Sequence, residues 1–185
     1  MTFNITGFRA NVNKMGLAKT NLFEMVISPP RVLRNQGVQS DFLRLMCHST
    51  ELPALDIVTY DSKPYAFGPT EKRPVGLDFN TLNTTFYVDE SFTTMNFFQS
   101  WASKIVDYNS YRGTFQVYYK ESYATTLDLY VYSGNDTKYT RHYTLYNAYP
   151  INVGSVTTAW ANQNEVMTLP VGFAYDGINI ETVTR

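Results

Sequence analysis

Two neighbouring stretches decide the fold: residues 141–154, RHYTLYNAYPINVG, and residues 164–176, NEVMTLPVGFAYD. In the second stretch every other residue is apolar or aromatic, which is the period of a strand with one buried face. That face would carry Met167, Leu169, Val171, Phe173 and Tyr175. Both stretches indicate sheet suited to assembly, and neither contains a cluster of reactive side chains.

A hairpin precedes this region and gives the clearest strand pair in the chain. Residues 127–132 alternate strictly, residues 133–136 supply the turn Ser-Gly-Asn-Asp, and residues 139–145 return. Further extended segments are predicted at residues 21–28, 42–48, 55–60, 78–88, 114–119 and 151–160. The pattern therefore predicts a mainly β fold of seven or eight antiparallel strands. Open sheets have unpaired edges, and pairing between copies of the chain would satisfy them.

One helix is predicted, from about residue 89 to residue 106. Asp89, Glu90 and Ser91 would accept hydrogen bonds from the free amides of its first turn. An apolar stripe follows at helical spacing, flanked by one Trp: Met95, Phe98, Trp101, Ala102 and Ile105. We expect this helix to lie across one face of the sheet, with Trp101 buried.

A long segment without an obvious period, residues 61–76, separates two predicted strands. It contains three prolines, two glycines and charges of both signs. Its notable side chains are Asp61, Lys63, Tyr65, Phe67, Glu71, Lys72, Arg73 and Val75. A structureless loop of this length is either functional or disordered, and its aromatic residues are unusual for a solvated linker.

Composition favours association between copies. The chain has 185 residues, enough for one domain spanning residues 1–185, and its net charge is −1. Charged residues make up 17%, against an average of about 25%, and aromatic residues make up 16%. Depletion of charge with enrichment of aromatic residues is typical of interface centres. The near-neutral net charge also argues against a protein that binds nucleic acid through a basic surface.

The N-terminal residues 1–20 are predicted to form an arm. The first acid is Glu24, whereas Arg9, Lys14 and Lys19 precede it, so the segment is either a contact arm or a solvated terminus. No apolar run suggests a signal peptide or membrane insertion. The single cysteine, Cys47, excludes an internal disulfide and agrees with a reducing compartment such as the cytosol.

The sequence contains few side chains arranged for catalysis or metal binding. Cys47 lies next to His48 on a predicted strand, where neighbours point to opposite faces, and His142 is distant in sequence. We therefore predict no enzymatic activity, no metal site and no cofactor, and an enzyme using Cys47 or His142 is the weakest hypothesis. A carbohydrate-binding β-sandwich is an alternative, and stacking of sugars on exposed Trp101 or Trp160 would favour it.

The order of these motifs resembles the tail tube protein of contractile-tailed bacteriophages. The resemblance rests on the ordered segments 21–23, 47–53, 86–90, 127–132, 143–154, 164–166 and 173–176, with Phe97 and Trp101 in the helix. It implies an antiparallel β-sandwich or distorted barrel with one flanking helix, similar to the tubes of type VI secretion systems. In that family six copies form a ring, and their strands join into one shared inner barrel.

The resemblance also implies a function and partners. Stacked hexameric rings would form a hollow tube in the virion tail, assembled in the host cytoplasm, through which genomic DNA passes without sequence-specific binding. The segment 61–76 would reach the neighbouring ring. The partners would be further copies of the chain, the tail sheath protein, baseplate and tube-terminator proteins, and a tape measure protein in the lumen. A baseplate or tube-end ring protein of the same fold is the alternative.

Overall fold

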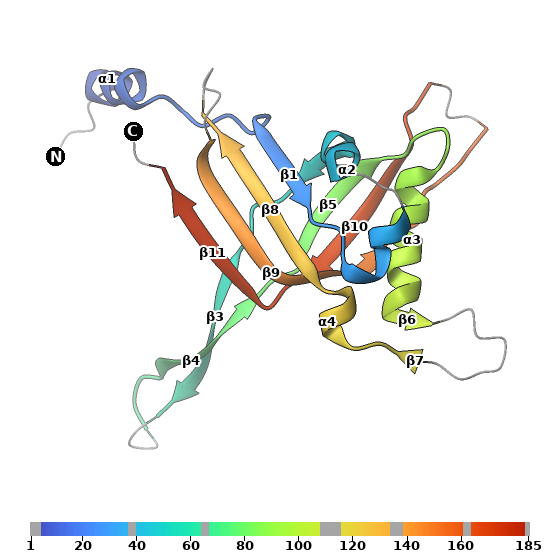
Figure 1. Ribbon diagram of the computed structural model, residues 1–185. Helices are drawn as coiled ribbons and strands as arrows, with labels where there is room; N and C mark the ends of the chain where they lie inside the picture. The colour runs from blue at the N-terminus through green and yellow to red at the C-terminus, as the bar shows by residue number, and fades with distance from the viewer. Residues whose placement is uncertain are drawn as a thin grey trace.

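The computed structural model describes residues 5–36, 40–63, 67–107, 116–133, 139–160 and 164–183, and it confirms a mainly β, antiparallel fold (Figure 1). Seven strands form one sheet in the order β1-β8-β9-β10-β5-β2, with β11 paired to β9. Their bounds are β1 Phe23–Ile27, β2 Cys47–Thr50, β5 Leu82–Tyr87, β8 Thr125–Tyr132, β9 Tyr139–Val153, β10 Thr168–Ala174 and β11 Gly177–Thr182. The described part of this sheet is open, so the expected distorted barrel is not closed within the chain.

The longest strand, β9, belongs to two halves of the sheet. Its first part pairs with β8 on one edge and β11 on the other, whereas its last part pairs with β10. Between these parts Asn147 has φ 54°, a left-handed conformation that Asn tolerates better than most residues. We call β1, β8, β11 and the start of β9 the first half-sheet, and β10, β5, β2 and the end of β9 the second half-sheet.

The core fills the space between the two half-sheets. Alternate residues of each strand point inward, as the period of two requires. The first half-sheet contributes Met25, Ile27, Leu127, Leu129, Tyr143 and Leu145, and the second contributes Leu82, Phe86, Leu169, Val171 and Phe173, all of them buried. Tyr175 is buried beyond the end of β10. The buried face predicted for residues 167–175 is therefore present, although Met167 at its start is only half-buried.

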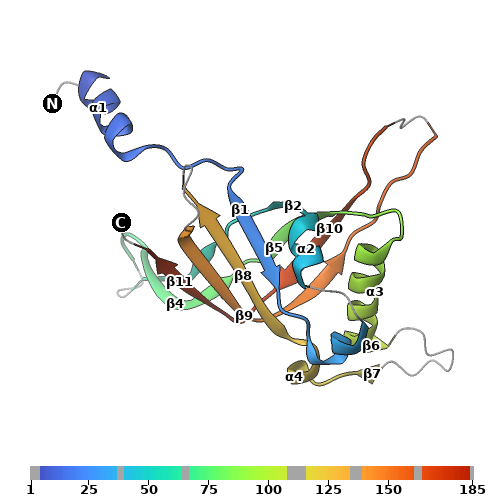
Figure 2. The ribbon, with the colours of Figure 1, turned by 45° about the horizontal axis from the view of Figure 1, so that its top comes forward.

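Helix α3, Thr93–Ile105, packs against the second half-sheet (Figure 2). Phe98 contacts Phe86 and Phe173, with ring centroids 4.8 and 6.1 Å apart. At its N-terminus the backbone N–H groups of Thr93 and Thr94 donate to the Asp89 carboxylate at 3.1 and 3.0 Å. These bonds, above all the one from Thr94, hold the pKa of Asp89 well below its ordinary value.

Four predicted features differ from the structure. Residues 42–48 were expected to be extended, but α2, Ser40–Met46, is a helix that buries Leu43 and leaves Leu45 exposed, as helix-favouring Leu, Arg and Met allow. The predicted strand 78–88 is interrupted at residues 80–81 and forms the end of β4 and all of β5. The extended segment at 151–160 is strand only to Val153. The final strand β11 was not predicted.

The chain also forms more helix than the single helix expected. The additional segments are α1 Ile5–Met15, the 3-10 turn η1 Arg31–Gln36 and α4 Lys120–Tyr123. Two short strands, β6 Val106–Asp107 and β7 Gln116–Val117, pair beside α3, and β7 lies within the extended segment predicted at 114–119. Apart from α1, which has 11 residues, these segments are shorter than most helices and strands, so a periodic pattern does not identify them.

Candidate assembly surfaces

The most prominent surface feature is a β-hairpin formed by β3, Leu55–Ser62, and β4, Glu71–Phe79. Figures 1 and 2 show it projecting from the body of the molecule. Its large apolar and aromatic side chains are exposed: Leu55, Ile57, Val58, Tyr60, Phe67, Val75 and Leu77. An exposed apolar patch of this kind marks an interaction surface in a folded protein.

This hairpin corrects the expectation of a structureless segment at residues 61–76. The strands continue through Asp61, which lies opposite Lys72, and Ser62, which lies opposite Glu71, before the turn begins. Opposite charges directly across a strand pair stabilise it, and Gly68 supplies a positive φ of 96° in the turn. Proline usually argues against a strand, but Pro74 lies in a two-stranded ribbon, where an edge strand tolerates proline.

The charged residues expected in this segment all lie on the exposed hairpin. Asp61, Lys63, Glu71, Lys72 and Arg73 are exposed, and Arg73 bonds Glu71 at 2.9 Å. Phe67 is 81% exposed at the turn. Tyr65 lies outside the described residues.

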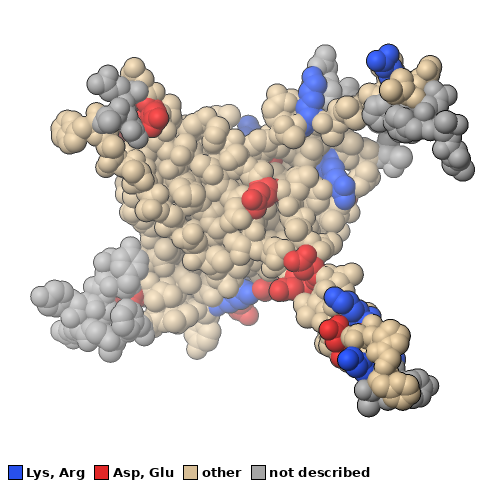
Figure 3. Space-filling view, turned by 180° about the vertical axis from the view of Figure 1, so that it is seen from behind, with Lys and Arg blue, Asp and Glu red and all other residues tan. Residues whose placement is uncertain are grey.

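At the base of the hairpin two acids face each other across the strands. Asp56 lies opposite Asp78 in the register, and both are exposed. Like charges directly opposite each other destabilise a strand pair. Asp56 accepts a hydrogen bond from the Asn80 side-chain amide at 2.7 Å, but no Lys or Arg among the described residues forms an ion pair with either acid. Figure 3 shows acidic side chains where the hairpin leaves the body.

The helix α3 residues expected to pack are buried or partly buried. Phe98 and Trp101 are fully buried, and Met95 and Ile105 pack against the core at intermediate exposure. Ala102 is half-buried. Trp101 donates from Nε1 to the backbone carbonyl of Tyr123 at 2.9 Å, so its buried polar atom is satisfied. Phe97 is buried as well and lies one residue from the expected stripe, where the wide apolar arc of a buried helix would have placed it.

Cys47 and His48 do not form a reactive pair. Burial raises the pKa of the Cys47 thiol to about 12, so the thiol stays protonated at neutral pH. His48 packs on Tyr87, with ring centroids 4.6 Å apart, on the exposed side of the strand. A protonated thiol is a poor nucleophile.

His142 belongs to a polar network on the outer side of the first half-sheet. Its Nε2 lies 2.9 Å from Asp128 Oδ1, and its ring stacks on Tyr130 at 4.3 Å. Thr144 Oγ1 donates to the same carboxylate at 3.1 Å. These side chains bond one another on the surface of the sheet, so we interpret the network as cross-strand pairing that stabilises the sheet.

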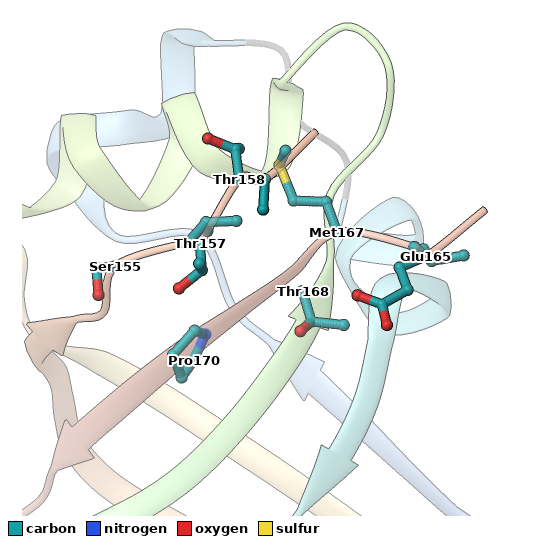
Figure 4. A pocket seen from close by; sticks show the side chains of 10 residues that line it. Ser155, Thr157, Thr158, Glu165, Met167, Thr168 and Pro170 are labelled. Atoms are coloured by element: carbon teal, nitrogen blue, oxygen red, sulfur yellow. The ribbon is translucent and has the colours of Figure 1, made fainter. Parts of the chain in front are cut away.

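An open cleft of about 520 Å³ lies between two legs of chain that join β9 to β10 (Figure 4). Thr157 and Thr158 line it from the outgoing leg, and Glu165 and Met167 from the returning leg. Trp160 is fully exposed near its rim. Glu165 is the one ionisable residue among the described residues that line the cleft.

Among the residues that the structure describes, no group of three His, Cys, Asp or Glu side chains is placed to hold a metal ion. Within the same ranges, every helix is too short or too polar to cross a membrane.

Comparison with known proteins shows the family of the chain. A family described as phage tail tube protein matches residues 18–181. Comparison with curated proteins gave no match. Among solved structures, the fold is similar to a chain of the PVC sheath–tube complex of an extracellular contractile injection system in the extended state, with a TM-score of 0.61 and 12% identity over 98% of this chain and 100% of that chain.

Two further structures share the fold at similarly low identity. A chain of the tube-terminating cap of the anti-feeding prophage has a TM-score of 0.59 and 15% identity over 90% of this chain and 92% of that chain. A chain of the PVC sheath/tube terminator has a TM-score of 0.57 and 13% identity over 90% and 97%. The family match covers most of the sequence, and the chain therefore belongs to the phage tail tube protein family.

Proposed function

We propose that the chain is the repeating subunit of a phage tail tube. Copies form hexameric rings, the rings stack, and the hollow tube carries genomic DNA inside a contractile sheath. The observation that carries the proposal is the exposed β3–β4 hairpin, whose apolar residues lack a covering element among the described parts of the chain. Burying them against a second copy would gain free energy roughly in proportion to the apolar area removed from water.

The sheet edges support the same proposal. The outer edges of β1 and β2 have no partner strand among the described residues. Pairing with strands of neighbouring copies would satisfy these edges and extend the open sheet around a ring. The sheath, baseplate and terminator proteins and a tape measure protein are the partners this role requires, and the tube places the chain in the virion tail.

Negative-stain electron microscopy of the purified protein, with light scattering on the same sample, tests the proposal. We expect six-fold rings or hollow tubes. Rings that never lengthen would favour a baseplate or tube-end protein, because its copies would not stack on one another. A monomer at every concentration, even with preformed tail baseplates as initiators, would contradict the proposal.

A hairpin variant tests the role of the arm directly. Replacing residues 59–75 by an Asn-Gly turn removes the outer hairpin and keeps the pairs nearest the body, since this turn suits a two-residue connection. We expect a folded protein that forms rings without tubes. Tubes of normal length from this variant would show that the outer hairpin does not join the rings.

A further inference from the structure

The cleft between the two legs that join β9 to β10 is held in shape by hydrogen bonds to the sheet. On the outgoing leg, the Gly154 N–H donates to the Pro170 carbonyl at 2.8 Å, and Val156 packs against the core. On the returning leg, the Met167 carbonyl accepts a hydrogen bond from the Val88 N–H at 3.0 Å. Because both legs are fixed to the sheet, a ligand would meet a formed site, and little of its binding free energy would be lost in ordering the legs.

The polar side chains that line the cleft are free to bind a ligand. Hydroxyl groups come from Ser155, Thr157, Thr158 and Thr168, and Glu165 supplies a carboxylate. In Figure 4, Thr157 and Glu165 lie on the two sides of the cleft, with Thr168 between them. Within the part of the chain that the structure describes, none of these five side chains forms a hydrogen bond or an ion pair. A hydroxyl group donates and accepts, and a carboxylate accepts, so this set suits a ligand that is rich in hydroxyl groups.

An aromatic ring lies beside these polar groups. Trp160 is fully exposed and lines a smaller hollow of about 330 Å³, which shares Thr158 and Ala159 with the cleft. The other tryptophan, Trp101, is fully buried. An indole ring has a large flat apolar face and a polar N–H at its edge, so it can stack on a ring that is apolar on its faces and polar at its rim. A pyranose sugar is such a ring.

The charge of the cleft separates the classes of ligand further. Among its described lining residues none is Lys or Arg, so a phosphate or carboxylate ligand would meet the like charge of Glu165 without a cation to offset it. A cationic ligand could bind Trp160 and Glu165, but it would leave the hydroxyl groups without partners. A neutral sugar uses the indole ring, the hydroxyl groups and the carboxylate together.

We propose that this cleft binds a neutral oligosaccharide of pyranose rings. One sugar ring stacks on the Trp160 indole, and the hydroxyl groups of the next ring bond Thr157 and Glu165. The cleft volume of about 520 Å³ lies within the range of roughly 300–1,000 Å³ that small-ligand sites occupy. This binding activity goes beyond the proposed tube function and does not depend on it.

Titration of the full-length protein with neutral oligosaccharides tests the proposal. The probes are cellohexaose, maltohexaose and N-acetylchitohexaose, each added separately and followed by calorimetry and by Trp fluorescence. We expect at least one of them to bind with a Kd of about 1 mM or below. Because Trp101 is buried, acrylamide quenches mainly the emission of Trp160, and a sugar stacked on Trp160 should reduce this quenching.

Three exposed positions give the variants for this titration. Trp160→Ala should raise the Kd about tenfold or more, and Thr157→Val, which removes one hydroxyl group and keeps the shape of the side chain, should raise it about threefold to tenfold. Tyr119→Ala is the matched control, because Tyr119 is 89% exposed and lies between β7 and α4, away from the cleft residues. It should leave the Kd unchanged, and all three variants should keep the urea midpoint of the unaltered protein.

Three results would overturn the proposal. One is no binding of any probe at about 10 mM, and another is an equal Kd for Trp160→Ala and the unaltered protein. The third is binding of trilysine in place of the sugars, lost in Trp160→Ala, which would make the cleft a cation site. None of these results changes whether the protein forms rings and tubes in the electron microscope, so failure of this proposal is distinguishable from failure of the proposed function.

Discussion

Replacing Phe98 by Ala tests whether helix α3 is an integral part of the core. Phe98 is fully buried, and its ring lies 4.8 Å from Phe86, 5.3 Å from Phe97 and 6.1 Å from Phe173. Removing it deletes the centre of this aromatic cluster and leaves a cavity, and such substitutions cost about 3–5 kcal/mol. A domain of this size has a free energy of unfolding of about 5–15 kcal/mol, so the loss is a large fraction of the total.

Urea unfolding of the monomer, followed by Trp fluorescence, measures this loss. We expect a lower midpoint with an unchanged slope, and a melting temperature lower by about 6–20 °C. Gln99→Ala, at the exposed neighbouring position on α3, is the control and should change the free energy of unfolding by less than about 0.5 kcal/mol. A Phe98→Ala loss below about 1 kcal/mol, or one equal to the control, would refute the claim that α3 is part of the core.

Three further predictions concern single positions. Asp89→Ala should lower the free energy of unfolding by about 1 kcal/mol at neutral pH. Because folding lowers the pKa of Asp89, its stabilisation is present above about pH 4 and is lost as the pH falls further. Chemical unfolding of both proteins from pH 7 to pH 2 should show the difference shrinking, and a constant difference would contradict this. Cys47, whose thiol pKa is raised to about 12, should react with a thiol reagent at pH 8 far more slowly in the folded than in the urea-unfolded protein, and equal rates would show that it is accessible. Gly154→Ala should cost about 1–3 kcal/mol because an added Cβ would lie 2.5 Å from Pro170 Cγ, whereas Gly76→Ala, with open space around it, should be tolerated; thermal unfolding of the two variants compares them.

The strands with long alternating patterns were predictable because their period matches their burial. The strands predicted at residues 127–132 and 139–145 and the face containing Leu169, Val171 and Phe173 are examples, since each strand has one face in the core. The position of α3 followed from its apolar stripe and from Asp89 as a local acceptor for amides. These features depend on residues that are close to one another along the chain, so the pattern of a single sequence is enough to predict them.

The remaining elements depend on contacts that a single sequence does not display. Helix α2 packs against β1 and buries one residue, Leu43, so its apolar run carries no clear period. Strand β11 exists because its backbone pairs with β9, and most of its side chains are exposed. The hairpin β3–β4 is exposed on both faces, so its alternation reports no burial within the chain. The charged residues of segment 61–76 could be identified from its composition. That Asp56 lies opposite Asp78 could be known only from the pairing of β3 with β4.

The topology of the sheet also bears on the order of events during synthesis. Strands β8, β9, β10 and β11 follow one another along the chain and pair as close neighbours, whereas β1 pairs with β8 and β5 with β10 across long separations in sequence. Local pairings form faster than distant ones because they require less loop-closure entropy. We therefore expect the C-terminal strands β8 to β11 to pair first and to act as the template on which β1 and β5 dock. The ribosome synthesises these strands after β1 and β5, so β1 must wait for β8 and one edge of β5 must wait for β10, although β5 can already pair with β2.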